Sequence, residues 1–588
     1  MATRYGLIIL INSIFFLIYR TYSGIIRHST FIDGVKLLTS TTTSYVSLLI
    51  INFACHILFD KMIFVTTGLF ISYVISFLLL FLFRILIKYI FEKYMNIEDK
   101  KKLINAVIYG SDANAISVAN ALKTETPSRF KLRGFIDKFN QNKTSKSILN
   151  LPIINQNKKI HVILRSLKAD ALIIAEKSLS KEETIALVEE CLEFNFKVFT
   201  VPLITDWEDE KQISNKVKSF EIEDLLDRKP IVLDTRSISN KLDGKTILIT
   251  GAAGSIGSEI TRQVLSFNPR KIIILDQAET PLHNLRLSIN GINENVIIRS
   301  VLADVRNRAD LEQVFQKYKP SVVYHAAAYK HVPLMEENPS QAIYTNVLGT
   351  KNLADLSIQY EVERFVMVST DKAVNPSSVM GASKRIAEKY VQTLHEKHRD
   401  DNNQINTKFI TTRFGNVLGS NGSIVPLFSK QILEGGPLTI THPEIIRYFM
   451  TIPEACQLVL EAGAMGKGGE IFIFDMGQPV KIIDLAKKMI RLAGFLPYKD
   501  IDIKIIGLRP GEKLYEELLN DTSKTLATHN EKILIAQELQ DNYKKIHSDT
   551  LDLLKNIEQI SNEEIVASMK KIVPEFKSMN SVFQTLDV

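Results

Sequence analysis

The sequence is poor in cysteine, with three among its 588 residues. Cys55, Cys191 and Cys456 lie far apart, and no pair of them forms a C-x-x-C motif. We therefore expect neither a disulfide framework nor a zinc site, and no other bound metal. The same scarcity indicates that the soluble part of the chain works in a reducing compartment.

The sequence also lacks a strong charge imbalance. Its 72 Lys and Arg residues against 65 Asp and Glu residues give a net charge of +7, which is modest for this length. Some of the basic residues cluster beside apolar N-terminal segments, and no nucleic-acid-binding motif accompanies them. We therefore assign the excess to membrane flanks and do not expect a nucleic acid as a partner. The length suggests about four structural units.

Three hydrophobic segments occur within residues 1–95, at 6–19, 46–59 and 62–91. No small-residue cleavage site follows the first, which disfavours a signal peptide. We expect about three transmembrane helices and a lipid bilayer as a partner; a soluble protein with very apolar helices is the alternative. The positive-inside rule places Met1 outside and everything after residue 95 in the cytoplasm, on the strength of Arg20, Arg27, Lys36, Arg84, Lys88 and Lys93.

Residues 100–225 alternate between strand and helix patterns and predict a small α/β domain. An apolar strand at 107–110 leads through a glycine turn into a helix at 111–122, and further strands are expected at 171–175 and 197–201. The turn lacks the G-x-G-x-x-G pattern of dinucleotide-binding folds. We favour a structural or regulatory scaffold over a bound nucleotide here.

A second strand–turn–helix unit carries a stronger signal. The strand 245–250 is followed at once by a G-x-x-G-x-x-G turn, made of Gly251, Gly254 and Gly257 with Ser255 and Ile256 between them. Such glycines let a pyrophosphate approach backbone amides at a helix N-terminus. This turn predicts a dinucleotide site; a plain turn followed by a surface acid is the alternative.

Acidic and small residues at later strand ends complete the predicted cofactor site. Asp276 ends the strand 272–276 and can bind a ribose 2′-hydroxyl while repelling a 2′-phosphate, which favours NAD over NADP. Asp304 follows another strand and is placed for the adenine. Ala326 and Ala328 end the apolar run 322–328, where a cofactor can lie close to the backbone. Asn346 lies on the next helix, with a structural or a functional role equally open.

The stretch 365–384 is where we expect chemistry. An apolar strand over 365–368 ends in Thr370, Asp371 and Lys372, groups that can hold or move protons at the carboxyl end of a strand. A helix beginning near Ser378 places Met380 and Lys384 on one face. The alternative is an exposed Asp371–Lys372 ion pair with Met380 in the core.

Together these motifs resemble those of the extended short-chain dehydrogenases/reductases. More narrowly, they are similar to the membrane-bound UDP-N-acetylglucosamine 4,6-dehydratases of bacterial capsule, O-antigen and glycan biosynthesis. The matching stretches are GAAGSIGSEI (251–260), HAAAYKHVPLME (325–336), STDKAVNP (369–376), MGASKR (380–385), RFGNVLGSNGSIVP (413–426) and RPGEKLYEEL (509–518).

The resemblance implies an α/β fold class with four parts. N-terminal transmembrane helices (1–95) and the small nucleotide-fold-like domain (100–225) precede an extended Rossmann catalytic domain with a C-terminal substrate lobe (240–540) and a helical tail (541–588). It places the protein in the bacterial inner membrane, with the catalytic domain cytoplasmic. The family's long form usually carries four spans, so we expect the chain to begin within the second of them.

The resemblance also implies a reaction. NAD⁺ oxidises the sugar at C4, water leaves across C5 and C6, and the hydride returns to C6. Asp371 is then the acid for the departing 6-hydroxyl and Lys372 the base at C5, while Thr370 can relay the proton of the 4-hydroxyl. Lys384 binds the nicotinamide ribose. Met380 fills the space of the tyrosine found in the wider superfamily, a substitution typical of the long-form dehydratases.

On the substrate side, the resemblance assigns residues of the C-terminal lobe. Asn416 meets the sugar diphosphate, and Arg447 and Arg509 suit its phosphates because a guanidinium binds oxyanions bidentately; surface ion pairs are the alternative for both. Glu512 can hold the uridine ribose. Lys330 and His331 lie near the cofactor cleft, with Lys330 counted among the substrate contacts.

Two other functions fit parts of the sequence. A nucleotide-sugar 4-epimerase shares the fold and cofactor, but it needs no acid–base pair for C5 and C6 and normally keeps the tyrosine. A membrane sensor or scaffold needs no STDK stretch at all. The sequence leaves the oligomeric state open, a homo-oligomer included.

Overall fold

The computed structural model describes residues 2–19, 21, 31–60, 62–90, 103–124, 128–138, 147–201, 218–220, 233–400, 407–517, 525–538 and 541–587. The chain forms two compact units, one of residues 1–104 and 123–131 and the other of residues 105–122 and 132–588. Three of the basic residues used for orientation lie outside the described residues, namely Arg20, Arg27 and Lys93, as does the predicted domain end at residue 225.

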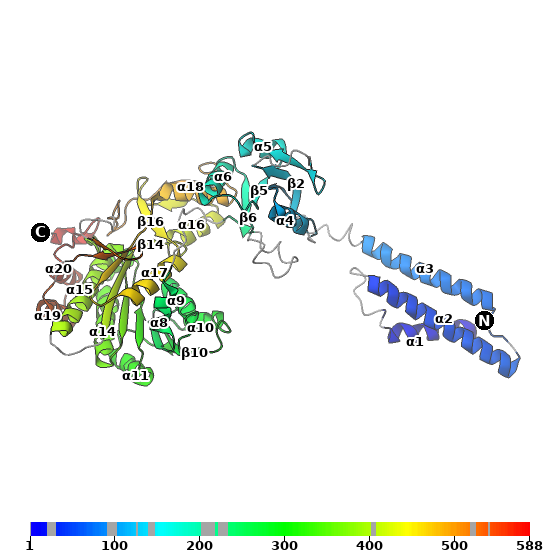
Figure 1. Ribbon diagram of the computed structural model, residues 1–588, viewed down its shortest axis with the longest axis horizontal. Helices are drawn as coiled ribbons and strands as arrows, with labels where there is room; N and C mark the ends of the chain where they lie inside the picture. Colours follow the sequence, from blue (N-terminus) through cyan, green and yellow to red (C-terminus); the bar gives the residue numbers. More distant parts are fainter. Residues whose placement is uncertain are drawn as a thin grey trace. The chain divides into compact units, whose positions relative to one another are not determined.

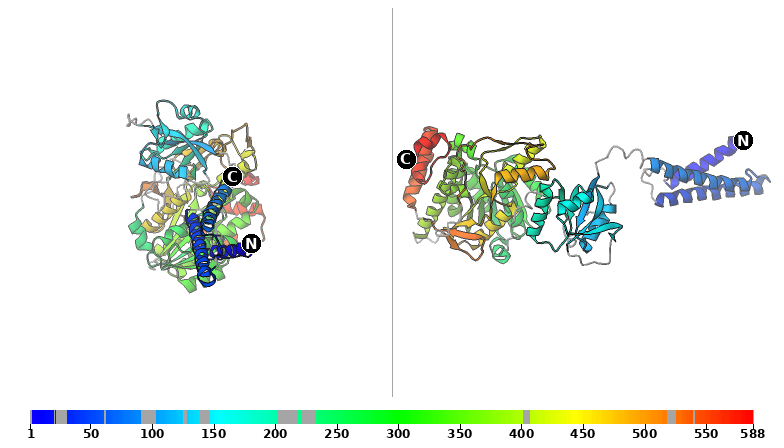
Figure 2. Two further views of the ribbon diagram at one scale, coloured as in Figure 1. Left: turned by 90° about the vertical axis from the view of Figure 1, so that its right-hand side faces the viewer. Right: turned by 90° about the horizontal axis from the view of Figure 1, so that it is seen from above.

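The first unit holds three apolar helices that lie side by side (Figures 1 and 2): α1 (Ala2–Ile18), α2 (Phe31–Phe59) and α3 (Thr66–Ile90). By length and composition, Gly34–Phe59 and Thr66–Ile87 can each cross a membrane, whereas the apolar helix Arg4–Ile18 is shorter. Large apolar side chains such as Phe53 and Leu79 point outward. These features suggest that α2 and α3 anchor the protein in a membrane.

Helix α2 is much longer than the hydrophobic segment 46–59 predicts. Its first half contains the hydroxyl-rich run 39–44, which interrupts the hydrophobic pattern. Most of those hydroxyls bond back within the helix, as in Thr41 Oγ1 to Leu37 O (3.0 Å) and Ser44 Oγ to Ser40 O (2.9 Å), whereas the buried Ser40 Oγ has no hydrogen-bond partner among the described residues. Because most of these polar groups are satisfied by their own helix, this segment extends the apolar helix to a full span.

The small α/β domain is a mainly parallel sheet in the order β3-β4-β2-β1-β5-β6-β7. The strands predicted near 107, 171 and 197 are confirmed as β1, β5 and β6. Its strands are β1 (Ile104–Tyr109), β2 (Phe130–Asp137), β3 (Ser147–Ile148), β4 (Leu151–Asn155), β5 (Ala171–Ile174), β6 (Lys197–Thr200) and β7 (Lys218–Ser219), and its helices are α4 (Ala113–Thr124), α5 (Ile160–Ser166) and α6 (Lys181–Glu193).

The catalytic domain is built on a larger sheet in the order β10-β9-β8-β11-β12-β13-β17-β21-β20. The strands from β10 to β17 run parallel, and β21 and β20 are added antiparallel. They are β8 (Thr246–Thr250), β9 (Lys271–Asp276), β10 (Ile297–Leu302), β11 (Val322–His325), β12 (Arg364–Thr370), β13 (Lys408–Phe414), β17 (Ile471–Phe474), β20 (Thr525–Ala527) and β21 (Ile533–Ala536).

Helices cover both faces of this sheet (Figure 1), and the strands are apolar on both sides for that reason. Along β8, Ile247 and Ile249 pack into one core while Leu248 packs into the other. The first core includes α8 (Thr235–Leu242), α9 (Ser255–Leu265), α10 (Glu279–Ser288) and α17 (Ile452–Met465); the second includes α11 (Arg308–Tyr318), α14 (Gly349–Gln359) and α15 (Val379–Asp400). The expected α/β fold class is confirmed.

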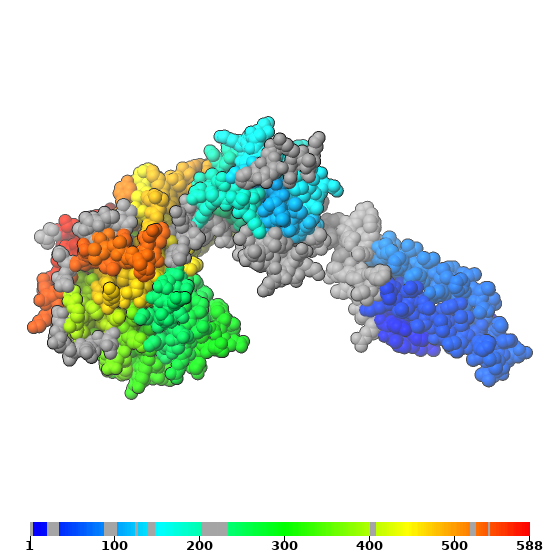
Figure 3. Space-filling view, in the orientation of Figure 1, coloured from blue at the N-terminus to red at the C-terminus, as the bar shows by residue number. Residues whose placement is uncertain are grey.

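The substrate lobe and the tail complete the chain. The lobe packs α16 (Ile424–Leu433) and α18 (Ile482–Leu492) with the short strands β14 (Asn416–Val417), β15 (Leu438–Ile440), β16 (Ile446–Met450), β18 (Pro479–Lys481) and β19 (Ile503–Ile505). The tail helices α19 (Tyr543–Asn556) and α20 (Asn562–Ile572) pack against α15, at the red end of the molecule in Figures 1 and 3. The tail therefore belongs to the fold of the catalytic domain.

Candidate active site

The order of the large sheet creates a crevice beside β8. Chain order reverses there, since β9 lies on one side of β8 and β11 on the other, and ligands of open α/β sheets bind at such a point. At positions 251 and 257 of the turn, the surrounding backbone leaves no room for a side chain. A Cβ on Gly251, whose φ is +65°, would lie 2.6 Å from Ala327 N, and one on Gly257 would lie 2.2 Å from Gly251 O.

The predicted cofactor residues come together around this crevice. One cavity is lined by Gly251, Gly254, Asp276, Asp304, Ala326 and Ala328, among others. Because position 254 is glycine, no side chain from that position caps the first amides of α9, where Ser255 and Ile256 lie. The arrangement fits an NAD-type dinucleotide, with its pyrophosphate at the helix N-terminus.

Two acids of this cavity are held by their neighbours. The Asp276 carboxylate accepts from the backbone amides of Ala253 and Ala278, both at 3.0 Å. Asp304 pairs with Arg306 at 2.5 Å. Burial raises the pKa of Asp304, but the hydrogen bonds and charge of Arg306 outweigh it and leave that pKa lowered. Both carboxylates are thus fixed in orientation at the strand ends.

Asn346 has a structural role. Its side chain accepts from Tyr329 N (2.8 Å) and donates to Tyr329 O (3.0 Å) and Ser383 Oγ (2.9 Å). It lies in a π-helical turn, Ile343–Leu348, just before α14. Asn346 therefore ties the loop after β11 to α15, so that two sides of the crevice keep a fixed spacing.

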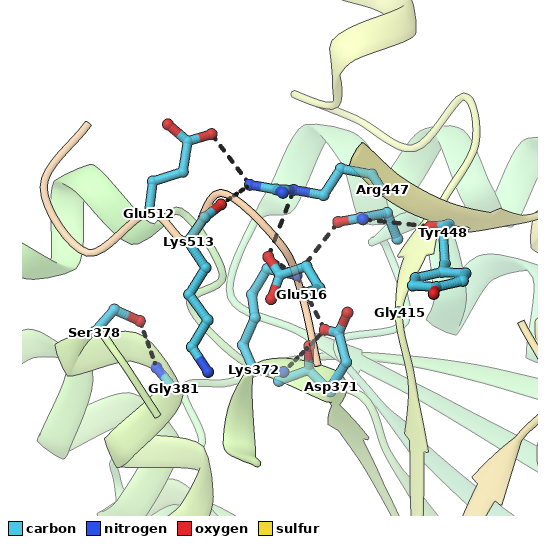
Figure 4. A network of polar contacts seen from close by, with 12 residues as sticks. Asp371, Lys372, Ser378, Gly381, Gly415, Arg447, Tyr448, Glu512, Lys513 and Glu516 are labelled. Carbon is cyan, nitrogen blue, oxygen red and sulfur yellow. Dashed lines mark hydrogen bonds and ion pairs between the residues drawn. The ribbon is translucent and has the colours of Figure 1, made fainter. Parts of the chain in front are cut away.

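The residues predicted to act as acid and base, Asp371 and Lys372, form a contact pair at the end of β12 (Figure 4). Lys372 Nζ lies 3.0 Å from Asp371 Oδ1, and Thr370 Oγ1 donates to the same carboxylate oxygen at 2.8 Å. Asp371 is 5% exposed at its side chain and Lys372 22%, so this is no surface ion pair. Lys372 also donates to Asn416 Oδ1 at 3.3 Å, which brings the substrate lobe to the pair.

Buried charges anchor the strand that carries this pair. Ser369 Oγ donates to Glu388 at 2.6 Å, and Arg413 Nε, from the neighbouring β13, donates to the same carboxylate at 2.8 Å. Glu538 accepts from Arg413 at 2.6 Å. Since these side chains form one hydrogen-bonded network, the ends of β12 and β13 are fixed to α15 and to the segment after β21. The sequence analysis did not predict this network.

Lys384 and Met380 lie on α15 as predicted, with different surroundings. Lys384 Nζ donates to Val368 O of β12 at 2.8 Å. Burial lowers the pKa of Lys384 to about 8, although the negative charge of Glu388 acts to raise that pKa. Met380 is 3% exposed and belongs to the core shared by α15 and the tail, with Met335, Ile343 and Met569.

The residues assigned to the substrate line a second cavity next to Lys372, together with His331; they are Lys330, Asn416, Arg447, Arg509 and Glu512. Arg447 donates to the backbone carbonyls of Ile446, Lys513 and Leu514 and contacts the carboxylates of Glu512 and Glu516. In this structure its guanidinium therefore fastens the segment 509–517. Arg509 is exposed in the same cavity and can reach an oxyanion.

Glu516 is a site residue that the sequence reasoning missed. Its Oε1 atom is 3.7 Å from Lys372 Nζ and 3.5 Å from Arg447 Nε (Figure 4). It belongs to the matched stretch 509–518, which contains three glutamates. Spacing along a loop does not tell which of them faces the catalytic pair, so only the structure separates Glu516 from its neighbours.

Comparison with known proteins assigns the chain to a family. A family model described as "Polysaccharide biosynthesis protein" matches residues 247–538. The "Probable polysaccharide biosynthesis protein EpsC" of Bacillus subtilis (strain 168) is 44% identical over 415 residues, covering 70% of this chain and 68% of that protein. The chain belongs to this polysaccharide biosynthesis family.

Two further relatives support the assignment. The "Capsular polysaccharide biosynthesis protein CapD" of Staphylococcus aureus is 52% identical over 61% of this chain and 59% of its own length. The "Uncharacterized membrane protein MJ1061" of Methanocaldococcus jannaschii is 49% identical over 48% of this chain and 83% of its own length. The catalytic domain is thus of the nucleotide-sugar epimerase/dehydratase type found in polysaccharide biosynthesis.

Among solved structures, the fold is similar to the dTDP-glucose 4,6-dehydratase DesIV of Streptomyces venezuelae, solved with NAD and TYD bound. That similarity has a TM-score of 0.42 at 21% identity and covers 53% of this chain and 97% of the other.

A second family model, described as "CoA-binding domain", matches residues 18–202, yet the first turn of the small domain does not fit a phosphate-bearing ligand. Asp112 Oδ1 accepts from Ala115 N at 2.9 Å, so a carboxylate already caps the N-terminus of α4. A Cβ on Gly110 would meet Glu176 N at 3.0 Å. Burial, together with the charges of Glu183, Glu176 and Asp137, raises the pKa of Tyr109 to about 12, so acidic side chains lie near this turn.

Proposed function

We propose that this family member is an NAD-dependent UDP-N-acetylglucosamine 4,6-dehydratase, making a UDP-4-keto-6-deoxy-N-acetylhexosamine for bacterial surface polysaccharide or glycan biosynthesis. The observation that carries the proposal is the Asp371–Lys372 contact of 3.0 Å at the end of β12. A dehydratase needs an acid for the 6-hydroxyl and a base for the C5 proton, and these two groups can supply them.

In the proposed mechanism Lys372 takes the C5 proton and Asp371 protonates the departing oxygen. Transfer of one proton from Lys372 Nζ to Asp371 Oδ1 turns the ion pair into the neutral amine and the carboxylic acid that these steps need. Exclusion of water by the substrate favours the neutral forms of both groups. Thr370, which shares a hydrogen bond with Asp371, is proposed to meet the 4-hydroxyl.

The proposed cofactor residues support NAD as the redox partner. Bound NAD would supply the reversible oxidation at C4 that makes the C5 proton acidic. The turn residues Gly251, Gly254, Ser255, Ile256 and Gly257 would hold its pyrophosphate, with Asp276 on the adenosine ribose and Asp304, Ala326 and Ala328 around the adenosine. Lys384 is proposed to hold the nicotinamide ribose, and Met380 to fill core space.

The substrate is proposed to lie in the cavity beside Lys372. Asn416 already contacts Lys372 and would meet the sugar diphosphate, with Arg509 as the exposed phosphate ligand and Lys330 near the cofactor side. Glu512 would hold the uridine ribose, although here its carboxylate accepts from Thr441 Oγ1 at 3.2 Å and contacts Arg447. Arg447 would act on the phosphates only after giving up part of its present contacts.

We further propose that the helices place this domain at the cytoplasmic face of the inner membrane. With α2 and α3 crossing, both Lys36, near the start of α2, and the end of α3 face the cytoplasm, as the positive-inside rule requires. Whether α1 also crosses changes only the side on which Met1 lies.

The fold is also compatible with a nucleotide-sugar 4-epimerase, and mass spectrometry separates the two. The purified full-length protein, with NAD⁺ and UDP-N-acetylglucosamine, is expected to form a product lighter by one water molecule. An epimerase would return a product of unchanged mass that separates from the substrate on chromatography. Nucleotide binding without any product would favour the sensor or scaffold.

A further inference from the structure

A second carboxylate, besides that of Asp371, faces Lys372. Glu516 Oε1 lies 3.7 Å from Lys372 Nζ, against 3.0 Å for Asp371 Oδ1. The Glu516 side chain is 7% exposed, so water and salt screen its charge only weakly. The ammonium group of Lys372 therefore lies between two carboxylates from distant parts of the chain.

Arg447 holds that carboxylate in position. Its Nε atom is 3.5 Å from Glu516 Oε1, and its Nη2 atom is 3.3 Å from Glu512 Oε1. Nη2 also donates to Lys513 O at 2.9 Å. One guanidinium thus fastens two acids of the segment 509–517 to β16, and only one of the two lies against Lys372.

The charged groups that face Lys372 come from three elements: Asp371 on its own turn, Glu516 on the segment 509–517 and Arg447 on β16. Lys330 and His331 line the same cavity farther along. Burial lowers the pKa of Lys372, but Asp371 and Glu516 outweigh burial and the opposing charge of Arg447, so that pKa lies above its usual value. Lys372 is therefore a cation here, the opposite of what a base requires.

We propose that Glu516 is a positioning residue that keeps Lys372 charged in the resting site and sets the pH at which it becomes a base. The proposal rests on the proposed role of Lys372 at C5. The acid–base unit then has three interacting groups, Asp371, Lys372 and Glu516. The proton of Lys372 passes to Asp371, the nearer carboxylate, and Glu516 remains the anion that balances Arg447.

The test measures the charge of Lys372 directly in the full-length protein. Acetic anhydride acylates neutral amines, and peptide mass spectrometry reports the labelling of Lys372 as a function of pH. We expect Glu516→Gln to move the midpoint of labelling to lower pH by about one unit, the usual effect of losing one nearby charge. Glu516→Asp keeps the negative charge but moves it away from Lys372, because the side chain is shorter. Its labelling midpoint should therefore lie between those of the wild type and Glu516→Gln.

Glu512→Gln is the matched control. Glu512 lies on the same segment and contacts the same arginine, but among the described residues no hydrogen bond or ion pair joins it to Lys372. Its labelling midpoint should equal that of the wild type. The proposal is overturned if Glu516→Gln superimposes on the wild type, or if Glu512→Gln shifts as far. If Glu516→Gln does not melt cooperatively, the labelling midpoint of Glu516→Asp decides the matter. A midpoint equal to that of the wild type would then overturn the proposal.

Labelling needs no substrate, so the two proposals fail separately. If UDP-N-acetylglucosamine is dehydrated while Glu516→Gln leaves the midpoint unchanged, the function stands and the role of Glu516 falls. If the midpoint shifts but no sugar is dehydrated, Glu516 controls Lys372 in an enzyme of a different reaction. If both proposals hold, the low-pH limb of the plot of kcat/KM against pH should shift to lower pH in Glu516→Gln. It should stay at the same pH in Glu512→Gln.

Discussion

The two α/β domains of this chain each lead from a strand through a glycine turn into a helix, and the two turns treat the helix N-terminus differently. In the catalytic domain, Gly254 leaves the first amides of α9 without a capping side chain from that position. In the small domain, Asp112 caps α4 with its own carboxylate. The same backbone motif thus presents free N–H groups in one domain and a negative charge in the other.

The difference teaches that the fold alone does not make a nucleotide site. The free amides at a helix N-terminus bind an anion only when the protein has not already satisfied them. The strand ends also differ. A cation beside an acid, Lys372 and Asp371, follows β12, whereas at the end of β1 burial and three acidic neighbours raise the pKa of Tyr109. We therefore expect one dinucleotide site per chain.

The largest effect should come from removing the base. Lys372→Met should lower turnover by roughly 10²–10⁴-fold, as expected for the loss of a positioned proton-transfer group, while NAD binding persists. Glu176→Gln, which lies just after β5 in the small domain, should leave turnover at the wild-type level. Steady-state kinetics on both variants measures this, and comparable losses would remove the distinction between the domains.

A substitution in the glycine turn of the catalytic domain should weaken NAD binding, whereas one in the glycine turn of the small domain should not. Gly257→Ala forces a Cβ to within 2.2 Å of Gly251 O. Overpacking of this kind costs about 1–3 kcal/mol, so NAD binding should weaken roughly 5- to 150-fold if that cost falls on the bound state. Gly110→Ala should strain only the small domain. Calorimetric titration with NAD⁺ checks both, with thermal melts to confirm folding; unchanged affinity in Gly257→Ala would contradict the proposed pyrophosphate site.

Lys384 should give NAD binding a pH dependence. Because its pKa is lowered to about 8, it is charged below that pH and loses its charge as the pH rises above it. A charged donor is worth more than a neutral one by about 1 kcal/mol, so affinity should fall several-fold between pH 7 and pH 9. Lys384→Met should bind NAD weakly at both pH values; a wild type with equal affinity at both would argue against a ribose contact.

The smallest effect concerns the capped turn. Asp112→Ala removes an N-cap, which costs about 1 kcal/mol, so the protein should melt at a slightly lower temperature. Exposure of the α4 amides should not create a second nucleotide site, because Glu176 and its acidic neighbours remain. Equilibrium dialysis with NAD⁺ and with CoA should still give one NAD and no CoA per chain.

Local sequence signals predicted the catalytic crevice well. Continuous apolar strands, a glycine turn and acids at strand ends are short-range features, and β8, β9, β11 and β12 formed where they indicated. The hydroxyl-rich half of α2 was missed because most of its hydroxyls are satisfied within the helix. Glu516 and the saturated contacts of Arg447 were also missed, since they depend on how the segment 509–517 returns across the site.

The central claim, that Lys372 removes the C5 proton during dehydration, has one direct test. Purified wild-type and Lys372→Met proteins are incubated with NAD⁺ and UDP-N-acetylglucosamine in D₂O, and proton NMR follows the sugar. The account predicts a 4-keto-6-deoxy product carrying deuterium at C5 from the wild type, and no such product from the variant. A wild type that instead makes UDP-N-acetylgalactosamine, or a Lys372→Met variant that dehydrates at the wild-type rate, would contradict it.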